Sequence, residues 1–159
     1  MNAADILKYG HRTVLRAVDG LSGDDWTSPG ACGRWSIQDL VAHLASYERA
    51  TEDVVLELLG VGPTPTLDRL RDPESSFNDR EVEARRGRDV GEVLSEYNEA
   101  VARVAALVAQ VPEDRRREPG LLPWYGEEYA LDDLLVYMVY GHKREHAAQI
   151  AAFRDELGR

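Results

Sequence analysis

Four long stretches of the sequence carry apolar residues at the spacing of an α-helix. They cover residues 3–21, 36–59, 90–111 and 130–157. In the first stretch, one face of the expected helix carries Leu7, Val14, Leu15, Val18 and Leu21. No alternating strand pattern separates the four stretches. Because each must bury its apolar face against another helix, the sequence predicts an all-α protein that folds as a four-helix bundle.

The connecting segments are rich in turn-forming residues. We expect loops at residues 22–35 and 112–129, and a linker broken by Gly and Pro at residues 60–71. Residues 72–88 mix both charges and are expected to form a solvated segment with one or two helical turns. All three connections are too long to force antiparallel neighbours, so loop length leaves the bundle topology open.

Length and composition limit the class of protein. The 159 residues and the hydrophobic content of 43% suit one domain that spans residues 1–159. A formal charge of −10 disfavours a nucleic-acid surface, because phosphate binding depends on clustered Lys and Arg. No apolar run approaches the roughly 18 residues of a membrane span, and the N-terminus lacks a signal-peptide pattern. We therefore expect a cytoplasmic protein with no nucleic-acid or membrane partner.

Two histidines occupy the apolar face of the last helical stretch. His142 and His146 fall in one stripe with Leu131, Leu135, Met138, Val139, Gln149 and Phe153. A buried imidazole needs partners for both ring nitrogens, because an unpaired buried polar group costs roughly 1–3 kcal/mol. The i, i+4 spacing also brings both rings within reach of one metal ion. The pair therefore suggests a metal site that takes a further ligand from elsewhere in the chain.

The second helical stretch supplies a candidate for that ligand. Ser36 is the expected N-cap of this helix, with Asp39 in the capping-box position. His43 lies on the flank of the apolar stripe, where it can face a neighbouring helix. Glu48 lies near the middle of the stripe, where a carboxylate is costly unless it is paired, protonated or close to a metal. An ion pair with an arginine of another helix is the alternative to a functional role for Glu48.

Other polar and aromatic residues are interpreted as structural. His11, alone at the margin of the first helix, is expected to be a packing residue rather than a ligand. Trp26 and Trp35 are expected to cover the end of the helix core, with a pocket wall as the alternative. Cys32 has no visible base or partner cysteine and is treated as incidental. Glu145 lies off the stripe and is expected to be solvated.

Two short motifs resemble those of a known family. The first has the form W-S-x-x-D-x-x-x-H-L at residues 35–44, and the second has the form H-x-x-x-H-x-x-Q-I at residues 142–150. With the helical order of nearly the whole chain, they resemble the DinB-like family of bacterial four-helix bundle proteins, which includes metal-dependent hydrolases and thiol-dependent transferases. Tyr47-Glu48 and the segment around Asn78-Asp79-Arg80 are similar, more particularly, to the branch related to colibactin self-resistance proteins.

The resemblance implies a DinB-like bundle of up-down-down-up topology with long connecting loops, often present as a homodimer. It also implies that His43, His142 and His146 hold one divalent metal ion, zinc or nickel. Three imidazoles leave a tetrahedral ion one open position, which is the layout of a catalytic zinc site. An ion there can activate water for hydrolysis or bind a low-molecular-weight thiol for transfer, with Glu48 as the candidate general base.

Three functional hypotheses follow. The first is a metal-dependent enzyme, either a hydrolase or a low-molecular-weight-thiol transferase, that acts on a small-molecule substrate. In it Gln149 orients a ligand, and Tyr47, Trp124 and Tyr125 line an entrance, although ordinary packing also accounts for each aromatic residue. The second is a protein that binds or sequesters a small molecule, with the histidines in a hydrogen-bonded polar network. The third is a structural or stress-response dimer without chemistry.

Overall fold

The structure, a computed structural model, describes residues 2–158. Over these residues it is all-helical, and its β-type pairing is limited to an isolated bridge between Cys32 and Trp35. The elements are α1 (Ala3–Val18), α2 (Gly23–Thr27), α3 (Ile37–Leu59), α4 (Pro65–Arg71), α5 (Phe77–Glu83), α6 (Val90–Val108), α7 (Glu113–Arg116), α8 (Leu131–Leu134), the π-helix η1 (Leu135–Gly141) and α9 (His142–Glu156). The prediction of an all-α protein is confirmed. Within the described range, no helix has both the length and the apolar character needed to cross a bilayer.

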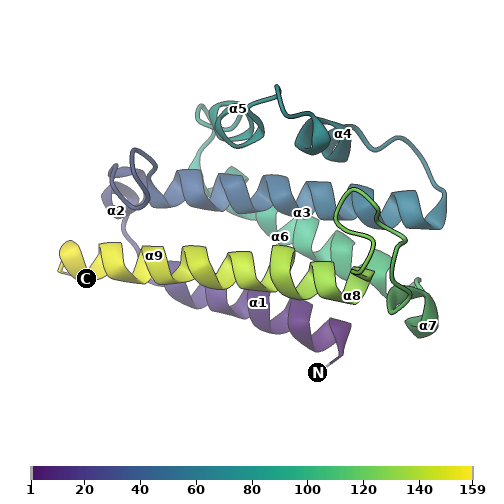
Figure 1. The fold of residues 1–159 in the computed structure, drawn as a ribbon. Helices are drawn as coiled ribbons and strands as arrows, with labels where there is room; N and C mark the ends of the chain where they lie inside the picture. Colours follow the sequence, from purple (N-terminus) through teal and green to yellow (C-terminus); the bar gives the residue numbers. More distant parts are fainter. Residues whose placement is uncertain (1, 159) are drawn as a thin grey trace.

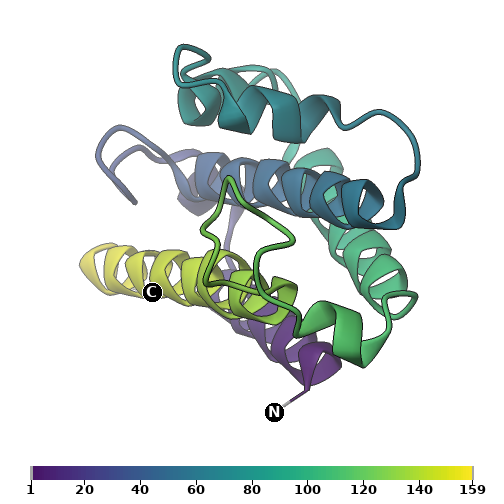
Figure 2. The same cartoon turned by 45° about the vertical axis from the view of Figure 1, so that its right-hand side comes forward.

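Three long helices and one composite rod form the body of the molecule (Figure 1). The helices are α1, α3 and α6, and the rod joins α8, η1 and α9 end to end. In Figure 1, α3 and α6 run from left to right, whereas α1 and the composite rod run from right to left. This arrangement requires a return crossing between α3 and α6. The segment that contains α4 and α5 makes it along the outer side of α3 (Figures 1 and 2).

Side-chain caps set the starts of the long helices. In the predicted capping box, Asp39 N donates to Ser36 Oγ at 3.1 Å, and Ser36 N donates to Asp39 Oδ2 at 3.0 Å. Asp89 and Glu92 form the same reciprocal pair at the start of α6. Helix α3 ends at Gly60, whose φ of 69° lies in the left-handed region that glycine adopts without strain. Local signals therefore fix both ends of the helix that carries His43.

Three short helices, α2, α4 and α7, lie in segments that we predicted to be loops or a linker, and there the prediction was wrong. Helix α2 has its own capping box between Ser22 and Asp25. Helix α4 is capped from a distance. Asp53 Oδ2 on α3 accepts hydrogen bonds from the backbone N–H groups of Thr66 and Leu67, at 2.7 and 3.0 Å. Because this cap belongs to another helix, the sequence of the segment itself gives no start signal for α4.

Two apolar clusters fill the core, and polar side chains lie between them. One cluster includes Leu40 and Ile150, and the other includes Val55 and Leu135. On α3 and α9, the buried polar side chains at the edge of the first cluster and between the two clusters are His43, Ser46, Glu48, Thr51, Lys143 and His146. We call this group the polar belt. It contains all but one of the site residues that the sequence predicted, and the remaining one, His142, is half-buried beside it.

The composite rod departs from the continuous α-helix that we predicted. Its buried residues are Leu131, Leu134, Leu135 and Val139 before the end of η1, and Lys143, His146, Ala147, Ile150 and Phe153 after it. A π-turn holds about one residue more than an α-turn, so the later set is displaced by about one residue from the stripe of a continuous helix. As a result Met138 and His142 are only half-buried, and Lys143 is fully buried in the place expected for His142.

Candidate metal centre

Three histidine side chains from two helices meet at one point. His43 comes from α3, and His142 and His146 come from α9. The Nε2 atom of His142 lies 2.9 Å from that of His43 and 2.8 Å from that of His146. The rings pack edge-on, with centroids 4.5 to 4.9 Å apart. The structure thus brings together the three side chains that the sequence singled out, in an arrangement that could hold a metal ion.

Hydrogen bonding alone does not satisfy the three Nε2 atoms. His146 Nδ1 lies 2.8 Å from Gln149 Oε1, and because a carbonyl oxygen only accepts, Nδ1 carries the hydrogen. The Nε2 atom of neutral His146 therefore presents a lone pair. If His142 Nε2 is protonated, it has no lone pair to offer His43; if it is not, its lone pair faces that of His146. A cation between the rings would attract all three lone pairs, so the residues fit a metal ion.

The three imidazoles are neutral near pH 7. Burial lowers the pKa of His43 to about 3, and the neighbouring His142 and His146 add to the effect. Burial also lowers the pKa of His142 to about 3, with His146 and Lys143 as further causes. The pKa of His146 is lowered by burial as well, although its hydrogen bond to Gln149 opposes the shift. Neutral imidazole is the form that binds a metal, so these side chains need lose no proton to do so.

Two of the three nitrogen separations are close to those of a tetrahedral zinc site, and all three ligand atoms lie within 4.8 Å of one another. Nitrogen ligands at roughly 2.0–2.1 Å from such an ion lie about 3.4 Å from one another. The observed separations of 2.8 and 2.9 Å are shorter by about half an ångström. A bound ion would therefore require small movements of the three rings.

Two aromatic side chains border the histidines. The Trp35 ring lies 5.0 Å from the His43 ring. The Tyr47 ring lies 4.8 Å from His43 and 4.5 Å from His142. Trp35 is therefore a wall of the site, the alternative that the sequence left open, whereas Trp26 is buried in the apolar cluster around Leu40.

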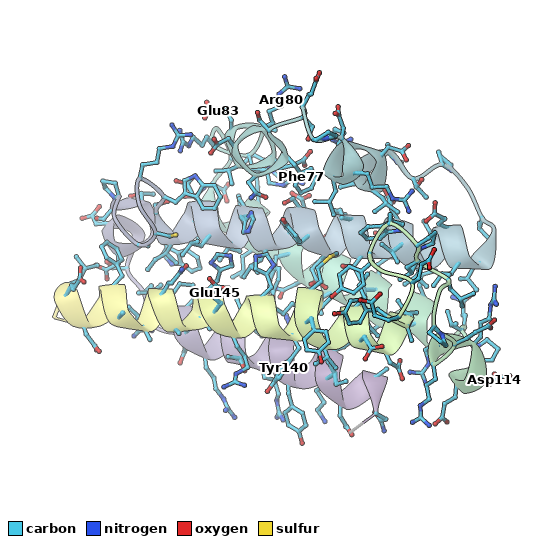
Figure 3. The ribbon with its side chains drawn as sticks, viewed as in Figure 1. Phe77, Arg80, Glu83, Asp114, Tyr140 and Glu145 are labelled. Carbon is cyan, nitrogen blue, oxygen red and sulfur yellow. The ribbon has the colours of Figure 1, made fainter. Side chains whose placement is uncertain are left out.

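Tyr47 connects the site to the crossing segment. Its hydroxyl donates to Asn78 Oδ1 at 3.2 Å, and its ring packs against Phe77 with centroids 5.6 Å apart. Phe77 lies on the side of α5 that faces α3 (Figure 3). Trp124 and Tyr125, the other aromatic residues proposed for an entrance, instead pack against the second apolar cluster. One of the three predicted entrance residues is therefore in contact with the histidine rings.

Glu48 is not among the side chains that converge at this point. Its Oε1 atom lies 2.9 Å from Lys143 Nζ, and the two side chains are 2% and 1% exposed. This is the alternative interpretation of Glu48, an ion pair with a cation of another helix, with a lysine in place of the expected arginine. The catalytic role suggested for Glu48 stays a prediction.

Sequence reasoning missed Lys143, because a lysine next to a histidine pair is normally solvated and the π-turn that rotates it inward has no clear sequence signal.

His11 lies outside the cluster, half-buried with its ring 5.4 Å from that of Tyr97, in line with the packing role expected for it. Glu145 is exposed, as expected. Cys32 is partly buried against the apolar cluster around Leu40.

The chain matches a known family model. The family model described as mycothiol maleylpyruvate isomerase N-terminal domain matches residues 7–133. The matched range includes His43 and Glu48, whereas His142 and His146 lie beyond its end. No curated protein and no solved structure matches the chain significantly.

Proposed function

The chain belongs to the mycothiol maleylpyruvate isomerase N-terminal domain family, within the DinB-like superfamily, and on this basis we propose that it is a metal-dependent enzyme that uses a low-molecular-weight thiol. In this proposal His43, His142 and His146 hold one divalent ion, zinc or nickel. The family is one of thiol-related, metal-binding enzymes. For this chain, mycothiol or a thiol like it is the proposed substrate. Membership of the branch related to colibactin self-resistance proteins stays a prediction.

The observation that carries the proposal is the meeting of three neutral imidazoles at their Nε2 atoms. Two of the separations are 2.8 and 2.9 Å, and no assignment of hydrogens satisfies both contacts. A protein core does not gain stability from ring nitrogens that face one another without a hydrogen for each contact, because each unpaired buried polar atom has a desolvation cost. The arrangement is expected in a protein that binds a cation between the three rings.

A bound ion would supply a Lewis acid with an open position, able to hold water or a thiol in its deprotonated form. The residues of the chain would shape the surroundings of that position. Gln149 holds the His146 ring so that Nε2 faces the other two histidines. Trp35 and Tyr47 border the rings and keep bulk water from their side of the site. A thiol is favoured over water as the bound group because the family is linked to thiol substrates.

Metal analysis tests whether the three histidines bind a divalent ion. Protein purified without a histidine tag, incubated with zinc or nickel and then dialysed, should retain one ion per chain. His142→Ala and His146→Ala should lose that ion while keeping the helical far-UV spectrum. His11→Ala is the matched control, because His11 is a half-buried histidine outside the cluster. A wild-type protein that retains no ion would overturn the proposal.

A cobalt-substituted protein tests whether the bound ion takes a thiol as its further ligand. Adding mycothiol should produce the absorption band of a thiolate bound to cobalt, and the same thiol with its sulfur methylated should produce none. A cobalt spectrum that does not respond to the thiol would remove the thiol from the proposal and leave water, and therefore hydrolysis, as the reaction to examine.

A second candidate function, binding of a small apolar molecule away from any metal, has one observation in its favour. A half-open groove of about 530 Å³ lies between α1 and α6, lined by residues such as Leu7, Val101 and Ala105 and by none of the three clustered histidines. A ligand in this groove should raise the melting temperature equally with and without a chelator. Ala105→Trp, which fills the groove, should abolish that response.

A further inference from the structure

A second contact joins the two helices that carry the histidines. Lys143 follows His142 on α9, and Glu48 follows Tyr47 on α3. Lys143 Nζ lies 2.9 Å from Glu48 Oε1, and both side chains are almost completely buried. Lys143 is therefore adjacent in sequence to one of the clustered histidines, and Glu48 is adjacent to Tyr47, whose ring packs against His43.

The ion pair is poorly satisfied, so stability alone does not explain it. Among the described residues, Glu48 Oε2 and the nearby Tyr97 Oη and His11 Nδ1 have no hydrogen-bond partner. Lys143 meets the carboxylate at ion-pair distance but not at a hydrogen-bond angle. In a buried ion pair with unsatisfied atoms, the attraction between the two charges is smaller than the free-energy cost of removing both from water. Apolar residues of the same size would make the packing of the two helices at least as stable. The best-attested use of such a pair is to specify one register between helices.

The positions of the two contacts between α3 and α9 suit a role in specifying the register of these helices. His43 and Glu48 are five residues apart on α3, which is about 7.5 Å along a helix axis. His43 contacts His142, and Glu48 contacts Lys143, so α3 and α9 touch at two separated points. A single contact would let the helices pivot or slide, whereas a second contact restricts both movements.

Helix α1 restricts the path of the lysine side chain. A Cβ atom at Gly10 would lie 3.2 Å from Lys143 Cδ, so the absence of a side chain at Gly10 makes room for the aliphatic part of the lysine. The Lys143 ammonium lies 5.8 Å from the Tyr97 ring on α6. The aliphatic part of the side chain thus passes close to Gly10, and its charged end lies beside Glu48.

We propose that Glu48 and Lys143 are positioning residues, whose buried ion pair sets the register of α3 against α9 and so holds His43 Nε2 opposite the Nε2 atoms of His142 and His146. The predicted effect on metal affinity rests on the proposed function. The predicted effect on the relative position of α3 and α9 does not depend on the proposed function.

Removing both charges separates positioning from stability. In Glu48→Gln and Lys143→Met, one buried charge is left alone, and both proteins should be less stable than the wild type. In the double variant no charge is left alone, so its melting temperature should return to the wild-type value or exceed it. Its zinc affinity, measured by competition with a chromogenic chelator, should nevertheless stay at least about tenfold below that of the wild type, because the register is no longer specified.

An ion pair far from the histidines is the matched control. Arg116 Nη1 and Asp132 Oδ1 are 2.9 Å apart and join α7 to α8. The double variant Arg116→Met/Asp132→Asn should keep wild-type zinc affinity. If Glu48→Gln/Lys143→Met binds zinc as tightly as this control does, the pair is a structural contact only and the proposal is wrong.

A measurement without metal keeps the inference separate from the proposed function. Spin labels at two exposed positions, Glu57→Cys on α3 and Ala148→Cys on α9, in a Cys32→Ser background, report the distance between the helices. The double variant should show a shifted or broader distance distribution than the wild type. An unchanged distribution would overturn the inference even if the wild type binds metal. A changed one in a protein that binds no metal would uphold the register and reject only the proposed function.

Discussion

His146 donates the hydrogen on its Nδ1 to Gln149 Oε1, 2.8 Å away and one turn further along α9. This bond leaves Nε2 as the free ring nitrogen and directs it at His142 Nε2, which also lies next to His43 Nε2. A carbonyl oxygen that fixes the tautomer of a ligating histidine also raises the basicity of that ligand. Gln149 therefore supports the site without belonging to the group that would touch an ion.

Replacing Gln149 should weaken metal binding and leave the fold intact. Gln149→Ala removes the acceptor that orients His146, and losses of this kind lower metal affinity by roughly 10–100-fold. Gln149→Glu keeps an acceptor and should retain most of the affinity. Chelator competition measures both affinities. The control is Gln110→Ala, which changes an exposed glutamine just after α6 whose amide donates to Ala106 O. Equal affinities for Gln149→Ala and wild type would contradict the role assigned to this bond.

Metal should stabilise the folded protein, because an ion that binds the assembled site does not bind the unfolded chain equally well. At a free zinc concentration of 100 times Kd, this linkage contributes about 2.7 kcal/mol. For a chain of this size that corresponds to a rise in Tm of roughly 5–10 °C. Thermal melts with added zinc and with a chelator measure the rise, and His142→Ala should show the same Tm in both. A zinc response that survives in this variant would place the ion elsewhere.

Stability should fall in acid through the carboxylates that flank Arg85. Arg85 lies 2.9 Å from Glu81 and 2.8 Å from Glu96. Burial raises the pKa of both carboxyls, but their hydrogen bonds and ion pairs, chiefly with Arg85 and also with Arg69 and Arg88, outweigh it and hold each pKa below its ordinary value. Such a group stabilises the fold at pH above the unfolded pKa, and the effect is lost as pH falls through the folded value.

Arg85→Met should therefore reduce the free energy of unfolding near pH 7 by about 1–3 kcal/mol. It should also flatten the decline of that free energy below about pH 4.5. Urea titrations at several pH values measure both effects. If the variant and the wild type lose stability in acid with the same slope, the network around Arg85 is not the cause of the loss.

The cap of α3 should contribute measurably to stability. Ser36→Ala removes the acceptor for Asp39 N and should cost about 1 kcal/mol. Ser95→Ala, an exposed serine in the interior of α6, should be neutral or slightly stabilising, because alanine favours the helix there. Urea unfolding of the two variants gives the comparison. A loss in Ser95→Ala as large as that in Ser36→Ala would mean that the cap is not what stabilises α3.

The long helices and the histidine cluster could be predicted because both follow from local periodicity. His43 lies on a flank of its stripe, and the i, i+4 spacing of His142 and His146 holds on any helix. The contacts that could not be predicted depend on residues far apart in sequence. Asp53 caps α4 from another helix, and the partner of Glu48 is a lysine that becomes buried only because the rod contains a π-turn.

Because of that π-turn, the direction in which His142 and His146 point depends on the number of residues in the rod. Residues before η1 and residues after it face the core in phases that differ by about one residue, or about 100°. Deleting a single residue within 135–141 would make the rod an uninterrupted α-helix and leave the leucines of α8 and the paired imidazoles of α9 in their present directions. Closing the wide turn without a deletion would instead turn one of these two groups away by about 100°. A bundle that lacks the wide turn can therefore point a His-x-x-x-His pair at α3 only by moving the pair one position along the sequence.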